Sequence, residues 1–166
     1  MTVRLTDSEF NLCGVVGTLR SIAAFKRHGR YGAPSGEGSY EMHTIGCTGE
    51  CAVAKYFNLY WPPAIGEFGG VDVGGILQVR ASARSDRRLM LHRTDHDDMP
   101  FVLALSHALP DVMLRGWAYA REGKRPDFWE DPLGWRPAYF VPHEVLRPID
   151  ELMEVVHDRA RKTDAW

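Results

Sequence analysis

Four residues in the middle of the chain have the types and spacing needed for chemistry on an anion. Asp72 lies between two pairs of glycines, and Gln78 and Arg80 follow on a segment that alternates apolar and polar residues. Side chains on a strand repeat every two residues, so Gln78 and Arg80 project from the same face. Glu50 lies upstream in a helix-like segment. Carboxylate and amide oxygens bind hard cations and guanidinium groups bind phosphates, so these residue types point to metal-assisted chemistry on a phosphate compound.

Two elements must position these residues. The glycine pair after Asp72 predicts a hairpin turn, which would bring Asp72 beside Gln78. Val79 is expected to point into the core, with its backbone carbonyl available at the strand edge. The helix expected over about residues 45–60 brings Glu50 to the same place if that helix packs on the sheet.

This arrangement resembles the PD-(D/E)XK nuclease superfamily, which has the restriction-endonuclease-like fold. The pattern of that superfamily is a helical Glu, a strand Asp, and Glu-x-Lys on the next strand. Here Glu50 matches the helical acid, Asp72 the strand acid, and Gln78-Val79-Arg80 the Glu-x-Lys tripeptide. The resemblance spans about residues 45–120 and is closest to small phage and bacterial members. It implies hydrolysis of DNA phosphodiester bonds with Mg²⁺ or Mn²⁺.

The motif departs from the usual pattern at two positions. Gln78 stands in place of an acid, and its amide can still offer an oxygen to a hard cation. Arg80 stands in place of lysine; it can hold the scissile phosphate, but it stays protonated and is a poor proton acceptor. The resemblance therefore implies catalytic roles for Glu50, Asp72, Gln78 and Arg80. It implies metal ligation by Glu50, Asp72, Gln78 and the Val79 carbonyl.

The charge of the chain restricts how it can contact nucleic acid. The formal net charge is −2, so DNA binding must come from a local basic patch. Arg84, Arg87 and Arg88 directly follow the Gln-x-Arg segment and are expected at the rim of the site, although a solvated turn is the alternative. Lys26 and Arg27, at the end of the first helix, would extend this rim.

Each of these residues also has a purely structural interpretation. Glu50 is compatible with a first-turn helix acid, Asp72 with a turn residue, and Gln78 and Arg80 with a solvated strand face. A second hypothesis is therefore a catalytically inactive nuclease-fold protein that binds nucleic acid or a protein partner. A third is an interaction protein whose contact surface is the tryptophan-rich stretch 124–137. A homodimer is compatible with all three.

Two further clusters contain possible metal ligands. The run from Asp95 to Asp98, with His92 nearby, reads more readily as an acidic hairpin turn than as a metal site. Cys47 and Cys51 follow His43 at helical spacing, but a zinc site would lack a fourth ligand. With Cys13, these cysteines are expected to be buried reduced thiols.

The whole chain is expected to form a single α/β domain over residues 1–166. Its 166 residues are 45% hydrophobic and 25% charged, as in average soluble domains. No segment is long and apolar enough to span a membrane and no signal peptide is read, so a cytoplasmic protein is expected. The first helix has an apolar stripe consisting of Phe10, Val15, Leu19, Ile22 and Ala23. The periodicity predicts a central mixed sheet of four to five strands, arranged as a meander and flanked by helices. The helices are expected over residues 7–26, 45–60 and 148–162. The strands are expected over residues 69–73, 76–82, 88–93, 101–106 and 112–120.

Overall fold

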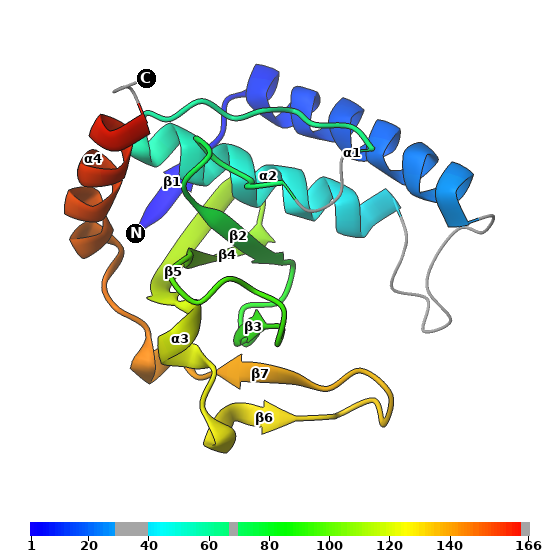
Figure 1. Cartoon of the computed structure of the whole chain (residues 1–166). Coiled ribbons are helices and arrows are strands. Elements are labelled where there is room, and N and C mark those ends of the chain that lie inside the picture. Colours follow the sequence, from blue (N-terminus) through cyan, green and yellow to red (C-terminus); the bar gives the residue numbers. More distant parts are fainter. Residues whose placement is uncertain (29–39, 67–69, 164–166) are drawn as a thin grey trace.

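The computed structural model describes residues 1–28, 40–66 and 70–163, and the structural statements below refer to these residues (Figure 1). None of the helices within these ranges is long and apolar enough to cross a bilayer. The elements, in chain order, are β1 (Thr2–Arg4), α1 (Asp7–His28), α2 (Tyr40–Phe57), β2 (Gln78–Ser82), β3 (Leu89–Leu91), β4 (Pro100–Ala108), β5 (Asp111–Tyr119), α3 (Ala120–Gly123), β6 (Trp129–Glu130), β7 (Ala138–Val141) and α4 (Leu152–Thr163).

The central sheet is mixed, with the strand order β1-β5-β4-β2. β5 is antiparallel to both β1 and β4, whereas β2 runs parallel to β4 with Val79 beside Val102. A second, antiparallel sheet has the order β3-β7-β6. The expected α/β domain with a central mixed sheet and flanking helices is therefore confirmed at this level.

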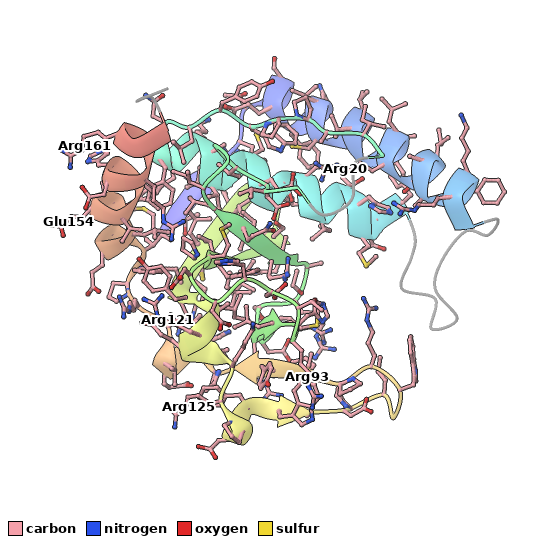
Figure 2. All side chains as sticks on the ribbon, viewed as in Figure 1. Arg20, Arg93, Arg121, Arg125, Glu154 and Arg161 are labelled. Atoms are coloured by element: carbon pink, nitrogen blue, oxygen red, sulfur yellow. The ribbon has the colours of Figure 1, made fainter. Side chains whose placement is uncertain are left out.

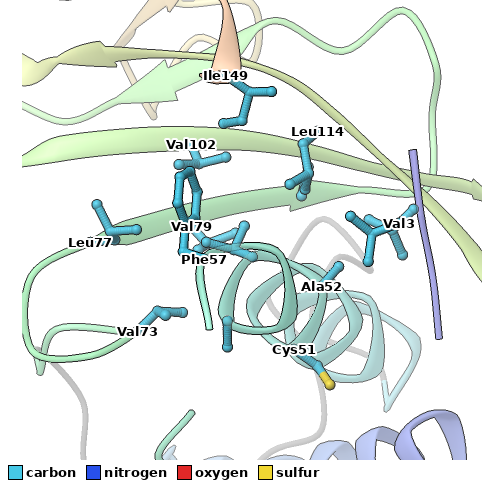
Figure 3. Close-up of a cluster of buried hydrophobic side chains, with 14 of the residues drawn as sticks. Val3, Cys51, Ala52, Phe57, Val73, Leu77, Val79, Val102, Leu114 and Ile149 are labelled. Carbon is cyan, nitrogen blue, oxygen red and sulfur yellow. The ribbon is translucent and has the colours of Figure 1, made fainter. Parts of the chain in front are cut away.

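Helices α1 and α2 form two layers over one face of the central sheet (Figure 1). α2 packs directly on β2 and β4, and α1 covers α2 from outside. The stretch from Cys47 to Ala54 is buried without interruption, as expected of a helix covered on both sides. Figure 3 shows Phe57 beside Val79 and Val102 of the sheet, and Ala52 on the side of Leu114 and Val3.

The contact between α2 and the sheet depends on Gly49. A Cβ atom at this position would lie 2.7 Å from the Ala81 Cβ and 3.1 Å from the Ala104 Cβ, closer than carbon atoms pack. The absence of a side chain lets the helix backbone approach β2. Gly49 thereby sets the distance between β2 and the next residue of the helix, Glu50.

We expect Gly49→Ala to lower the free energy of unfolding by about 1–3 kcal/mol, since the added methyl group overpacks the interface. Gly46→Ala, one turn earlier, is the matched control. Its Cβ would meet only the Glu50 Oε1 atom, at 4.0 Å, and alanine should gain about 0.5–1 kcal/mol over glycine in a helix. Urea denaturation measures both variants. Wild-type stability in Gly49→Ala would contradict the close packing.

The expected meander is wrong at β3. Phe101, Leu103 and Leu105 point away from α2 and are fully buried, so β4 needs cover on both of its faces. β3 leaves the central sheet and supplies that cover by pairing with β7 and burying Leu89 and Leu91. Of the strand segment expected over residues 69–73, Gly69 lies outside the described residues, and residues 70–73 form only a single bridge, between Val73 and Leu77.

The apolar stripe of α1 does not all face the core. Val15, Leu19 and Ile22 are exposed on the outer side of the helix, whereas Cys13 and Val16 are buried against α2. The helix instead uses small residues for its inner contact. Gly17 lies so close to α2 that a Cβ there would be 2.7 Å from the Thr44 Cα.

Candidate functional site

Glu50 is held between α1 and α2 by a dense set of donors. The residue as a whole is 7% exposed. Arg20 of α1 donates from Nη1 to Oε1 at 2.7 Å and from Nη2 to Oε2 at 2.8 Å, and Trp61 donates from Nε1 to Oε2 at 2.9 Å. Figure 2 marks Arg20 at the level where α1 passes α2. The Arg20 Nε atom also donates to the Ala64 carbonyl at 2.9 Å, so one guanidinium links the two helices and the segment after α2.

Asp72 lies at the free edge of the central sheet. The hairpin expected after it is present at its turn, where Val73 bridges Leu77 and Gly74 and Gly75 have φ angles of 57° and 69°. Such angles favour glycine. The turn places the Asp72 Oδ2 atom 2.8 Å from the backbone nitrogen of Val79, which donates to it. The N–H and C=O of one strand residue point to the same side, so the Val79 carbonyl faces this edge as well.

The electrostatics of Asp72 show which charges surround it. Burial, and next the negative charge of Glu50, raise the pKa of Asp72 from 3.8 to about 6. The hydrogen bond from Val79 and the positive charges of Arg80 and Arg20 oppose this rise. The fold therefore brings the charge of Glu50 close enough to disfavour ionisation of Asp72, and perturbed carboxyl groups of this kind occur in many functional sites.

Gln78 and Arg80 lie on the opposite face of β2 from α2. Val79 points toward α2, so its two neighbours point toward the second sheet. The Gln78 Nε2 atom donates to the Gly70 carbonyl at 2.9 Å, which holds the amide beside the turn that carries Asp72.

The guanidinium of Arg80 already has several partners within the protein. Its Nη2 atom donates to both Asp95 carboxylate oxygens, at 3.0 and 3.1 Å, and its Nε atom donates to the Met90 carbonyl at 3.2 Å. It also stacks on the Phe101 ring, 4.8 Å from its centroid. Arg80 therefore joins β2 to β3 and the following loop, in addition to any role toward a ligand.

A cleft of about 530 Å³ opens between the first turns of α2, the β2–β3 loop and the β6–β7 hairpin. Four of the arginines predicted around the site line it, namely Arg80, Arg84, Arg87 and Arg88, together with Arg136 from the hairpin. Glu50, Asp72, Lys26 and Arg27 are not among its lining residues. The predicted residues thus separate into an acidic pair, with Glu50 between α1 and α2 and Asp72 at the edge of β2, and an arginine-lined cleft on the other face of β2.

The arginines of the cleft differ in how far they are neutralised. Arg84 pairs with Asp86, and Arg88 makes a two-bond pair with Glu130 at 2.7 and 2.6 Å. Arg87 and Arg136 make no side-chain hydrogen bond or ion pair with the described residues. These two arginines are the ones best placed to bind an anion from solution.

The acidic pair has an oxygen donor set that suits Mg²⁺. No three His, Cys, Asp or Glu side chains gather into a metal-binding group in the described ranges. Mg²⁺ commonly binds through one or two carboxylates and completes its shell with water and substrate phosphates. Glu50, Asp72 and the Val79 carbonyl supply oxygen atoms of this kind, and they do not form a closed cage for zinc. Both Glu50 oxygens already accept hydrogen bonds from Arg20 and Trp61, so a metal ion would have to compete with these donors.

The remaining candidate metal ligands have structural partners. Asp95 accepts from Arg80 and from the His92 backbone, Asp97 pairs with Lys124, and Asp98 pairs with Arg121, so this run forms a turn tied by ion pairs.

The cysteines are buried free thiols, as predicted. Burial raises the pKa of Cys47 to about 12, which keeps this thiol protonated and disfavours metal binding.

The two tryptophans of the 124–137 stretch have different environments. Trp129 packs edge-on against Tyr139, with ring centroids 4.7 Å apart, and Arg93 covers it at 4.1 Å. Figure 2 marks Arg93 near β6 and β7. Trp135 is 54% exposed and is the one free to contact a partner.

Sequence reasoning missed Arg20, Trp61 and Arg136. One signal pointed to Arg20: it is the single charged residue between Glu9 and Lys26 in an otherwise uncharged part of α1. A lone charge in such a helix commonly pairs with a buried acid. Nothing in the spacing of the sequence indicated Trp61 or Arg136.

Comparison with known proteins provides no further constraint. No protein family, curated protein or solved structure matches the chain. The function must be argued from the residues and their geometry.

Proposed function

We propose that the protein is a metal-dependent nuclease that hydrolyses DNA phosphodiester bonds at the free edge of β2. The observation that carries the proposal is the pair of Glu50 and Asp72, whose mutual repulsion contributes to an Asp72 pKa of about 6. Two carboxylates in a partly buried site repel each other, and a bound divalent cation offsets this repulsion. The restriction-endonuclease-like fold and the variant Glu/Asp/Gln-x-Arg motif are part of the same proposal.

Each residue would have a distinct task. Glu50, Asp72 and the Val79 carbonyl would hold Mg²⁺ or Mn²⁺, with the Gln78 amide beside them. The bound ion would lower the pKa of a water and stabilise the attacking and leaving oxygens. Arg20 fixes the orientation of Glu50 through two hydrogen bonds, so the carboxylate is positioned before the substrate binds.

The arginine-lined cleft would hold the DNA backbone beside the acidic pair. Arg80 connects the two regions, because it lines the cleft and its charge also acts on Asp72. Arg84, Arg87, Arg88 and Arg136 would bind phosphates on either side of the scissile bond. Lys26 and Arg27 would act only on longer DNA, since they lie outside the cleft lining.

The test is cleavage of supercoiled plasmid and of single-stranded oligonucleotide with Mg²⁺, with Mn²⁺ and with EDTA. Cleavage that requires the metal and is lost on Asp72→Asn supports the proposal. Intact DNA in both metals, with DNA binding preserved, excludes hydrolysis.

A second candidate function is DNA binding without hydrolysis. It is favoured by the ion pairs, because Glu50 is neutralised by Arg20 and Arg80 by Asp95. A site that has lost its metal would keep such pairs for stability. In that case the arginine-lined cleft would be the functional surface.

Both candidates predict salt-sensitive DNA binding in EDTA. Each neutralised phosphate releases counterions and contributes about 0.9 to the slope of log affinity against log salt for duplex DNA. We expect Arg87→Ala/Arg136→Ala to reduce this slope by about 2, as measured by fluorescence anisotropy. Arg161→Ala is the control, because Arg161 lies on α4 at the far end of the molecule from the cleft (Figure 2). Binding that ignores salt, or an equal effect of Arg161→Ala, would contradict a role for the cleft.

A further inference from the structure

The outer face of α1 carries a continuous apolar stripe. Leu12, Val15, Leu19 and Ile22 are 47%, 57%, 40% and 37% exposed. Most surface helices place polar residues on the side opposite the core. Here the outward side is the apolar side, and in Figure 1 the helix α1 forms the outer layer above α2.

The same face lacks charge along its length. The charged residues of α1 lie at its two ends, apart from Arg20, which points inward to Glu50. Ser8, Asn11, Thr18 and Ala23 complete the outward side between those ends. An uncharged apolar strip of this length on an exposed helix is typical of a protein–protein contact.

The spacing of the stripe fits a second α-helix. Successive members are three, four and three residues apart, which is the pattern of a seam between two packed helices. The pattern is also symmetric about Gly17. If a second α1 runs in the opposite direction, Leu12 meets Ile22 and Val15 meets Leu19.

The charges at the ends of α1 fit the same arrangement. The first turn is acidic and includes exposed Asp7, and the last turn includes exposed Lys26. An antiparallel pair places each acidic end beside the basic end of the partner. A parallel pair would instead bring like charges together at both ends.

We propose that two copies of this chain associate through the outer face of α1, as an antiparallel helix pair. The two-fold axis crosses α1 at the level of Gly17 along the helix. The interface is isologous, since the same stripe serves both copies. Ile65, 45% exposed, continues the apolar surface in the segment beside Ala23. At 22 residues, α1 is about 33 Å long, which gives an interface near the low end of stable dimers. The dimer should therefore depend on protein concentration.

Sedimentation velocity of the full chain over a range of concentrations tests the proposal. We expect wild type to shift from monomer to dimer, and Val15→Glu to weaken the dimer at least about tenfold, because two carboxylates would be buried in an apolar seam. Val145→Glu is the matched control, since Val145 is 40% exposed on a different part of the surface. Circular dichroism checks that both variants fold. A wild type that stays monomeric, or a dimer unaffected by Val15→Glu, overturns the proposal.

A charge exchange tests the direction of the helices. The dimer has two end contacts, each between Lys26 of one copy and the acidic first turn of the other. At low salt, Lys26→Glu should raise the dimer dissociation constant by about two- to fivefold for each contact. Asp7→Lys/Lys26→Glu should restore the affinity, because in an antiparallel pair the exchanged charges still face each other. A parallel pair would show no such rescue, and that result would overturn the antiparallel arrangement.

Discussion

Replacing Asp72 with asparagine is expected to abolish metal-dependent cleavage and to make the protein more stable at neutral pH. The loss of activity should be on the order of 10³-fold, because a catalytic metal contributes several kcal/mol and 1.36 kcal/mol is a factor of ten. The asparagine oxygen can still accept the Val79 backbone hydrogen bond, so the turn keeps its shape. Opposite changes in activity and stability are typical of a residue retained for function.

The gain in stability follows from the direction of the pKa shift. The pKa of Asp72 is raised from 3.8 to about 6 by burial and by Glu50, so between these pH values the folded state binds more protons than the unfolded state. Stability therefore falls as the pH rises through this window, and at neutral pH the charge destabilises the fold. A shift of this size corresponds to about 3 kcal/mol.

Thermal unfolding of wild type and Asp72→Asn at several pH values from 4 to 8, in EDTA, measures the effect. The two proteins should have similar Tm values near pH 4 and diverge as the pH rises, with the variant more stable. Asp86→Asn is the control, because Asp86 is exposed and pairs with its near neighbour Arg84. A Tm that falls in Asp72→Asn at neutral pH would indicate that the carboxylate serves the fold.

The sequence allowed the local features of this fold to be predicted where one short pattern determines them. The apolar run from Phe101 to Leu105 predicted a central strand, and β4 is buried on both faces. The glycine pair predicted the turn that brings Asp72 to β2. The arginines after Arg80 were expected together, and they line one cleft.

Features that depend on distant parts of the chain could not be predicted. β3 pairs with β7, about fifty residues later, because the second face of β4 needs cover. The ion pairs Arg20–Glu50 and Arg80–Asp95 join residues that are 30 and 15 positions apart in the sequence. The hydrophobic periodicity of the sequence does not indicate such pairs. In α1, helical spacing revealed the stripe but not that most of it faces outward.

Removing Arg20 is expected to have the largest effect on stability. In Arg20→Met the Glu50 carboxylate loses its bidentate partner, although it is only 9% exposed in the ion pair. Breaking a buried pair at one partner costs about 3–5 kcal/mol. Arg20→Met/Glu50→Gln should recover most of this loss, because the unpaired charge is gone and Trp61 can still donate to the amide oxygen.

An exposed ion pair provides the comparison for chemical denaturation. Arg4 pairs with Asp111 at the surface, with the two side chains 71% and 38% exposed, so Arg4→Met should cost at most about 1 kcal/mol. If Arg4→Met and Arg20→Met lower the free energy of unfolding equally, burial does not strengthen the Arg20–Glu50 interaction. A double variant as unstable as Arg20→Met would mean that packing of the arginine stem, and not its charge, holds α1 on α2.

The same variants test whether Glu50 can hold a metal. Without Arg20, less positive charge compensates the negative charges of Glu50 and Asp72, so a divalent cation that binds to both should stabilise the folded state. Millimolar Mg²⁺ should therefore raise the Tm of Arg20→Met more than that of wild type, and the extra rise should vanish in Arg20→Met/Glu50→Gln. This measurement does not depend on catalysis, so it separates a metal site from a working nuclease. A Tm of Arg20→Met that does not respond to Mg²⁺ would remove Glu50 from the metal site and leave the arginine-lined cleft as the functional surface.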